Sequence, residues 1–159
     1  MTTLPQKLRE SLAECTCKSL KDKGCKVGLG LIPHDHVIVS GKKYQRHYSY
    51  SDDLCDFILC VRDTDGANRV ATIELKGGDV DEREFKKAHN QLKNGAMVAD
   101  SIIGSSRVDA FRPFLIKKKT LNPMAYRLLQ MDIYKIPFRS FSEHILIAKS
   151  DTDLPYPFR

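Results

Sequence analysis

The segment that most constrains the fold is residues 55–76. Two stretches rich in β-forming residues, 55–62 (CDFILCVR) and 69–76 (RVATIELK), flank the polar linker DTDGAN. The Asp-Gly step in this linker is a strong turn signal. The segment therefore predicts an antiparallel β-hairpin in the middle of the chain.

A long amphipathic helix is expected after the hairpin, over residues 81–103. Asp81 followed by Glu84 resembles a capping box, and acidic residues suit the N-terminus of a helix. Apolar residues then recur at spacings of three and four and form one continuous face: Phe85, Ala88, Leu92, Ala96, Ala99 and Ile103. The hairpin and this helix are the clearest elements of the sequence.

Weaker patterns define the region before the hairpin. Apolar residues at approximately helical spacing predict a first helix over residues 4–21, and Gly24 supplies a stop signal. Residues 26–32 and 36–40 look extended, with glycines and a proline as breakers between and within them.

After the long helix, the pattern returns to strands. Residues 110–117 predict a strand, which Pro113 would confine to an edge or irregular position. A short helix over 123–131 is expected, with Asn122 as its cap, followed by strands over 133–138 and 144–148. This order predicts an α/β fold in which helices flank a mixed central β-sheet. The length of 159 residues fits a single domain over residues 1–159.

Charge and cysteine content narrow the class of protein. The 26 Lys and Arg outnumber the 20 Asp and Glu, and a formal charge of +6 favours acidic partners, nucleic acid first, although a basic surface is also a common solubility device. We expect a cytoplasmic protein without membrane contact, since the sequence has neither a signal-peptide-like start nor a membrane-length apolar stretch. The five cysteines fit a reducing compartment, and their spacing matches zinc sites poorly, so we expect small buried apolar side chains.

A polar cluster interrupts the otherwise apolar hairpin. Because side chains alternate along a strand, Glu74 and Lys76 point to one face while Ile73 and Leu75 point to the other. Asp56 precedes the partner strand, and the hairpin can bring it beside Glu74. Two carboxylates suit Mg²⁺, which prefers oxygen ligands and keeps several waters. The lysine could then orient the attacking water and offset charge on a scissile phosphate.

Other interpretations of this cluster stay open. The same residues could form a partly buried salt-bridge network or the solvated face of a two-sided hairpin. Asp52 and Asp53 lie just upstream and could replace Asp56 if the strand register differs. We prefer Asp56.

The motifs CDFIL, ATIELKGG and AHNQLKNGA follow one another within residues 55–97. In this order they resemble the core of the PD-(D/E)xK nucleases, the superfamily of many restriction enzymes and Holliday-junction resolvases. The resemblance implies a restriction-endonuclease-like core of helix, three strands, helix and strand. It also implies dependence on Mg²⁺ or Mn²⁺ and hydrolysis of phosphodiester bonds to leave a 5′-phosphate. The strict signature has proline where this chain has Cys55.

The resemblance assigns roles to individual residues. Asp56, Glu74 and the carbonyl of Leu75 would bind the metal, and Lys76 would position the attacking water. Gln91 matches a glutamine that many members carry on the following helix, although the tyrosine found four residues later in some subfamilies is replaced here by Gly95. Many members also have a glutamate on the first helix, for which Glu14 is the best candidate and Glu10 competes.

A basic and aromatic segment precedes the hairpin. We expect Lys42, Lys43 and Arg46 to bind phosphates, with the neighbouring side chains Tyr44, His47, Tyr48 and Tyr50 available for stacking. A solvated β-hairpin with ordinary surface tyrosines would have a similar composition. The lysines at 117–119 and the histidines in segment 34–36 are interpreted as surface residues.

Three functions are compatible with these patterns. The favoured one is a Mg²⁺-dependent deoxyribonuclease, with DNA preferred over RNA as substrate. The alternatives are a catalytically weak nucleic-acid-binding domain and a protein-interaction domain on the same fold. A homodimer is expected by analogy with small relatives that cut two strands.

Overall fold

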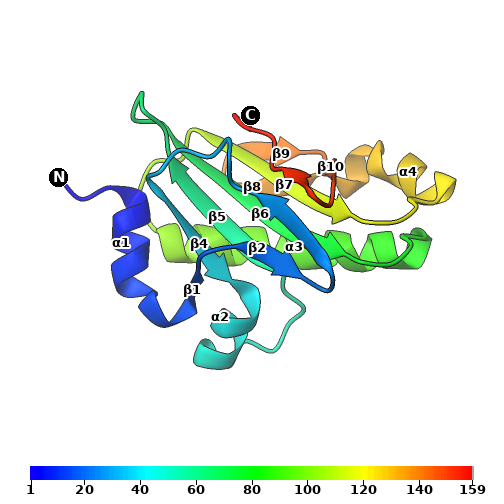
Figure 1. Ribbon diagram of the computed structural model, residues 1–159, viewed down its shortest axis with the longest axis horizontal. Helices are drawn as coiled ribbons and strands as arrows, with labels where there is room; N and C mark the ends of the chain where they lie inside the picture. The colour runs from blue at the N-terminus through cyan, green and yellow to red at the C-terminus, as the bar shows by residue number, and fades with distance from the viewer. Residues whose placement is uncertain (159) are drawn as a thin grey trace.

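The computed structural model, which describes residues 1–158, contains a six-stranded sheet with the predicted hairpin at its centre (Figure 1). Along the sheet the strands are β1 (Thr16–Cys17), β4 (His36–Ser40), β5 (Phe57–Arg62), β6 (Asn68–Lys76), β7 (Ala110–Lys117) and β10 (Leu146–Lys149). The first four strands pair antiparallel, whereas β6, β7 and β10 pair parallel. The molecule is therefore α/β with a mixed central sheet, as the sequence predicts.

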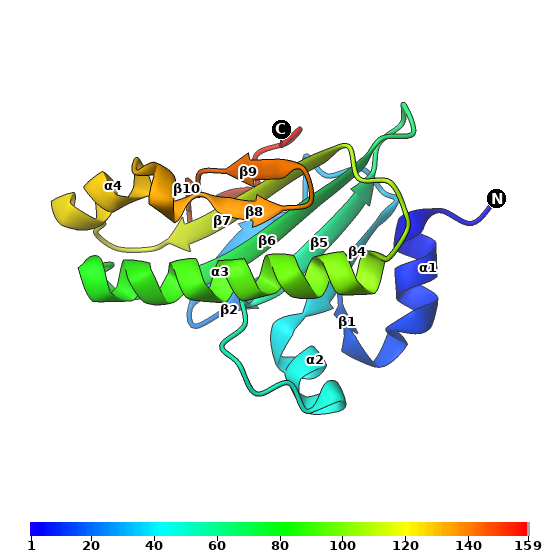
Figure 2. The same ribbon diagram turned by 180° about the vertical axis from the view of Figure 1, so that it is seen from behind.

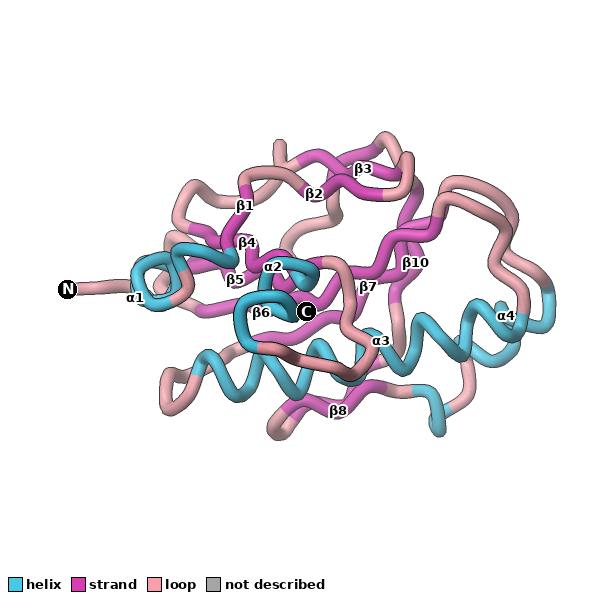
Figure 3. The backbone as a smooth tube through the Cα atoms, turned by 90° about the horizontal axis from the view of Figure 1, so that it is seen from below, coloured by secondary structure: helices cyan, strands magenta, loops and turns pink. Residues whose placement is uncertain are grey.

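Different layers cover the two faces of this sheet. Helix α3 (Glu82–Ile103) crosses one face together with the hairpin of β8 (Ile136–Phe138) and β9 (Phe141–Glu143), as Figure 2 shows. A small sheet of β2 (Leu20–Asp22), β3 (Cys25–Gly28) and β11 (Thr152–Asp153) covers the other face (Figure 3). Each face has its own hydrophobic core.

Helix α3 follows the prediction closely. Asp81 is its N-cap, and its side chain accepts a hydrogen bond of 2.8 Å from the Glu84 N–H. The six apolar residues of the predicted face are all buried, because that face packs on the sheet. The Glu84 side chain turns away from the cap and makes an ion pair with Lys76.

The predicted first helix is too long. Helix α1 spans Leu4–Ser11, a 3₁₀ turn η1 spans Ala13–Cys15, and the chain then enters β1 and β2. Gly24 does not stop a helix; with φ of 76° it forms the turn between β2 and β3. Leu20 fits the helical spacing but is buried in the core under the small sheet, whereas Leu8 and Leu12 are buried in the other core. The spacing therefore does not reflect one helix.

The basic and aromatic segment is a helix rather than a hairpin. Helix α2 spans Gly41–Tyr48, and the side chain of its N-cap Ser40 accepts a hydrogen bond from the Lys43 N–H. The predicted strand 36–40 is confirmed as β4. Ser49, with φ of 51°, ends the helix.

The C-terminal predictions are partly right. Strand β7 is interior, contrary to expectation, but Pro113 lies one residue before the stretch of β7 that pairs with β10. Helix α4 (Pro123–Leu129) begins as predicted, with the Asn122 side chain accepting from the Met124 N–H. Residues 132–134 form the 3₁₀ turn η2 before β8, so the predicted strand over 133–138 begins too early.

The cysteines and the helices bear on two further expectations. None of the five cysteines forms a disulfide in the described part of the chain, and four of them are buried. Within residues 1–158, no helix is both long enough and apolar enough to cross a membrane.

Candidate active site

An open strand end creates the site. The pairing of β5 with β6 ends at Phe57 and Ile73, whereas β6 continues to Lys76 along β7. Asp56 fills the unpaired edge: its N–H donates to Glu74 Oε1 at 3.1 Å, and its Oδ2 accepts from the Leu75 N–H at 2.8 Å. Side-chain hydrogen bonds thus replace the missing ladder bonds and fix both carboxylates.

Strand alternation sets the predicted faces. Ile73 and Leu75 lie in the core under the small sheet, whereas Glu74 and Lys76 point to the α3 side. Glu74 is 0% exposed, Asp56 7% and Lys76 9%. The structure therefore brings the three predicted residues together at an almost fully buried position, where charged groups need close partners.

Lys23 is the partner that sequence reasoning missed. It lies on the β2–β3 turn, and its Nζ is 3.3 Å from both Asp56 carboxylate oxygens and 3.2 Å from Glu74 Oε2. The turn packs against Gly77, where a Cβ atom would lie 2.3 Å from the Lys23 carbonyl oxygen. No local signal links Lys23 to residues so distant in sequence.

Helix α3 supplies partners for Lys76. The Lys76 Nζ lies 3.4 Å from Glu74 Oε2, Glu84 Oε2 and Gln91 Oε1. Gln91, predicted at this place, is buried, and its carbonyl accepts from the Cys55 N–H at 3.1 Å. Glu84 was expected only in a cap. We call these six residues the charged cluster: Lys23, Asp56, Glu74, Lys76, Glu84 and Gln91.

Burial shapes the electrostatics of the charged cluster. It raises the pKa of Glu74 to about 7, and the charge of Asp56 adds to this effect, while Lys23 and Lys76 oppose it. Burial alone would lower the pKa of Lys23, but Glu74 and Asp56 outweigh it, so that pKa lies above its usual value. Ionisation of Glu74 is therefore less favourable in the folded protein than in water, even with two lysines beside it.

The two carboxylates converge on one cation, the Lys23 ammonium. The Leu75 carbonyl faces the same open edge, since the N–H and C=O of one strand residue point to the same side. Within residues 1–158 no three His, Cys, Asp or Glu side chains converge as metal donors, so water and substrate would complete the shell. The oxygen donors fit Mg²⁺ or Mn²⁺ if the ammonium moves away.

Other predicted site residues lie elsewhere. The Glu14 side chain is 73% exposed and pairs with His47 Nδ1 at 2.7 Å, and Glu10 is exposed on α1. Neither belongs to the charged cluster. Asp52 and Asp53 are exposed, so the register favours Asp56 as predicted.

The predicted phosphate-binding residues separate on α2. Lys42 makes an ion pair of 2.9 Å with Asp22 and lines a small pocket of about 220 Å³ beside Asp56. Lys43 faces a different cleft, where its Nζ donates to the Thr16 carbonyl at 2.9 Å. Arg46 is exposed and lines neither.

No protein-family model, no curated protein and no solved structure matches this chain. What the site can do therefore has to be inferred from its own geometry and chemistry.

Proposed function

We propose that this chain is a metal-dependent nuclease that hydrolyses phosphodiester bonds in DNA, with a core like that of the PD-(D/E)xK nucleases. The observation that carries the proposal is the fixed pair Asp56 and Glu74 at an open strand end, converging on one cation beside Lys76. A purely structural role explains this poorly, because burying Glu74 opposes its ionisation. Perturbed carboxylates of this kind concentrate at functional sites.

Each residue has a defined role in this proposal. Asp56, Glu74 and the Leu75 carbonyl would hold the metal, which would activate water and screen the phosphate charge. Lys76 orients the attacking water and offsets negative charge on the scissile phosphate. Glu84 and Gln91 hold the Lys76 ammonium in place, 3.4 Å from each of their oxygens.

Lys23 keeps the two carboxylates together before metal binds. Its ammonium offsets the repulsion between the two carboxylates, which is strong because burial lowers the effective dielectric constant. It must then give up its place to the metal, and its turn position, with a side chain 40% exposed, leaves it a path to solvent.

The direct test is cleavage of labelled linear, circular and single-stranded DNA with Mg²⁺, Mn²⁺ or EDTA. Asp56→Asn is compared with Asp53→Asn, a matched change at an exposed aspartate three residues upstream. We expect metal-dependent cutting by the wild type and by Asp53→Asn, and loss of cutting in Asp56→Asn and in EDTA. A wild type that cuts neither DNA nor RNA with either metal would refute the nuclease.

One observation favours a second candidate, a catalytically weak nucleic-acid-binding domain. The Lys23 ammonium neutralises the carboxylates without any metal. Calorimetric titration with Mg²⁺ and Mn²⁺ separates the two candidates. Binding that Lys23→Ala strengthens supports the nuclease, whereas no metal binding by either protein favours the binding domain.

A further inference from the structure

A second site lies outside the charged cluster, at the β1 edge of the central sheet. A cleft of about 550 Å³ there is lined by three cationic and two histidine side chains from α1, the β1–β2 connection, the start of β4 with the residues before it, and α2. We call it the basic cleft and define it by Arg9, Lys18, His34, His36 and Lys43. No Asp or Glu of the described chain lines it.

The three cations of the basic cleft form no ion pair with an acid of the described chain. Arg9 Nη2 donates to the His36 carbonyl at 2.6 Å, and Lys43 Nζ donates to the Thr16 carbonyl. Carbonyl groups orient these cations but carry no net charge. Among residues 1–158, no carboxylate pairs with Arg9, Lys18 or Lys43. Asp35, between His34 and His36 in the chain, accepts a hydrogen bond from the Thr3 hydroxyl.

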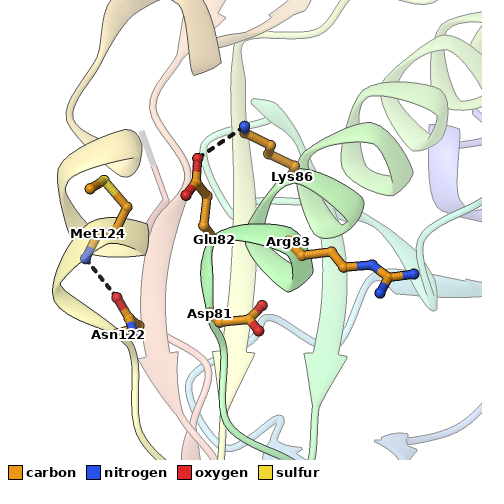
Figure 4. A pocket seen from close by; sticks show the side chains of 6 residues that line it. All are labelled: Asp81, Glu82, Arg83, Lys86, Asn122 and Met124. Carbon is orange, nitrogen blue, oxygen red and sulfur yellow. Dashed lines mark hydrogen bonds and ion pairs between the residues drawn. The ribbon is translucent and has the colours of Figure 1, made fainter.

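A comparable pocket on another part of the surface shows the opposite arrangement. Figure 4 shows Arg83 and Lys86 beside Asp81 and Glu82, at the start of α3. There the Lys86 Nζ lies 3.0 Å from Glu82 Oε1. Acidic and basic side chains are mixed in that pocket, so it attracts a polyanion less strongly than the basic cleft does.

The basic cleft leads toward the charged cluster. Cys17 lines both the basic cleft and the small pocket beside Asp56, which is also lined by Lys21, Lys42 and Asp22, the ion-pair partner of Lys42. A chain of phosphates lying in the basic cleft would therefore continue past these lysines to the carboxylates. Such a path suits a ligand with regularly spaced negative charges, as in a nucleic-acid backbone.

The lining also indicates which nucleic acid fits. No Phe, Tyr or Trp of residues 1–158 lines the basic cleft, so only the small imidazole rings of His34 and His36 could stack on unpaired bases. The tyrosines of α2 pack on each other, with the Tyr44 and Tyr48 ring centroids 4.8 Å apart. Contacts to phosphates alone suit a duplex, whose bases are already stacked.

We propose that the basic cleft binds the phosphate backbone of duplex DNA, without reading its sequence, and directs it to the charged cluster. The choice of DNA as ligand rests on the proposed nuclease function. The position of the cleft and its preference for a duplex come from its own residues.

The experiment is fluorescence anisotropy of a labelled DNA duplex, and of one of its single strands, with the full chain in EDTA at several salt concentrations. Arg9→Ala/Lys43→Ala is compared with Arg83→Ala/Lys86→Ala, which removes two cations from the mixed pocket of Figure 4. Lys18→Ala provides a second cleft variant that should fold normally, because the Lys18 side chain makes no hydrogen bond to the described backbone.

We expect the cleft double variant to weaken duplex binding about tenfold at moderate salt. It should also reduce the slope of log K against log salt by about 1.8, because two phosphate contacts are lost. Lys18→Ala should reduce the slope by about half as much, and the control variant should leave it unchanged. Equal losses in cleft and control variants, or tighter binding of the single strand, would overturn the proposal.

Binding in EDTA does not depend on catalysis, so the two proposals fail separately. Cleft-dependent duplex binding by a protein that never cuts would refute the nuclease and support the cleft. Metal-dependent cutting that is insensitive to all cleft variants would support the nuclease and refute the cleft.

Discussion

The charged cluster and the basic cleft are neighbours that hold charge in opposite ways. In the charged cluster, Asp56, Glu74 and Lys76 are buried, and each lies within 3.4 Å of an opposite charge. In the basic cleft, Arg9 and Lys43 are exposed and are oriented by carbonyl groups. Buried, mutually fixed charges suit chemistry that needs defined positions, whereas exposed uncompensated cations suit binding of a long anion.

The largest effect is expected when the Lys76 ammonium is removed from the charged cluster. We expect Lys76→Ala to lower the cleavage rate by about 100-fold or more, because a fixed cation at the scissile phosphate is lost. Duplex binding in EDTA should stay within about twofold of wild type, since Lys76 faces α3 and not the basic cleft.

The matched control is Lys87→Ala, which removes an exposed lysine of α3. Initial rates on a labelled duplex measure the effect. Equal rates for Lys76→Ala and wild type would remove Lys76 from the catalytic machinery.

The next effect tests how the Lys23 turn is attached to the charged cluster. Gly77→Ala would place a Cβ 2.3 Å from the Lys23 carbonyl, whereas Gly78→Ala meets nothing within 4 Å. We expect Gly77→Ala to lower the free energy of unfolding by about 1–3 kcal/mol through overpacking. Urea denaturation of both variants measures the difference, and equal stabilities would contradict the close packing of this turn.

A smaller effect concerns the cost of ionising Glu74. Its pKa is raised to about 7 by burial and then by Asp56, so the folded protein is most stable when Glu74 is protonated. That stability is present below its unfolded pKa and is lost as pH rises through about 7. Glu74→Gln in EDTA should therefore raise the melting temperature by a few degrees at pH 8 and by less at pH 5.

Glu74→Gln should abolish cleavage in the same protein that gains stability, because the amide cannot replace a carboxylate as a metal ligand. Calorimetric melting curves at the two pH values test the thermal effect. A variant that is less stable than wild type at pH 8 would show that the ion pairs outweigh the burial of the carboxylate.

The smallest effect is expected at Glu14, outside both regions. Its carboxylate is 73% exposed and pairs only with His47 among the described residues. Glu14→Gln should change the free energy of unfolding by less than about 0.5 kcal/mol and leave cleavage unchanged. A large loss of cleavage would mean that Glu14 enters the charged cluster when substrate or metal binds.

Sequence reasoning worked where the pattern was local. The turn signal at residues 63–68 and the alternation along 69–76 predicted the hairpin and the shared face of Glu74 and Lys76, and the spacing on α3 predicted the buried helix face. Gln91 came from the resemblance to a nuclease family and not from the spacing. Sequence reasoning failed in residues 4–24, where an apolar spacing compatible with a helix was divided between α1, a 3₁₀ turn and two strands. There the apolar residues are drawn into different cores, which no local period records.

Strand alternation and turn chemistry act between near neighbours, so the amino-acid sequence was enough to predict the hairpin and to indicate that Asp56 can lie beside Glu74. Contacts between distant segments, by contrast, pair Lys23 with both carboxylates, pair Glu84 with Lys76 and bring four separate segments together around the basic cleft. These contacts arise where the small sheet and helices α1, α2 and α3 pack on the central sheet. Packing of whole layers is set by the burial of apolar surface across the molecule, which the spacing of residues within one segment does not encode.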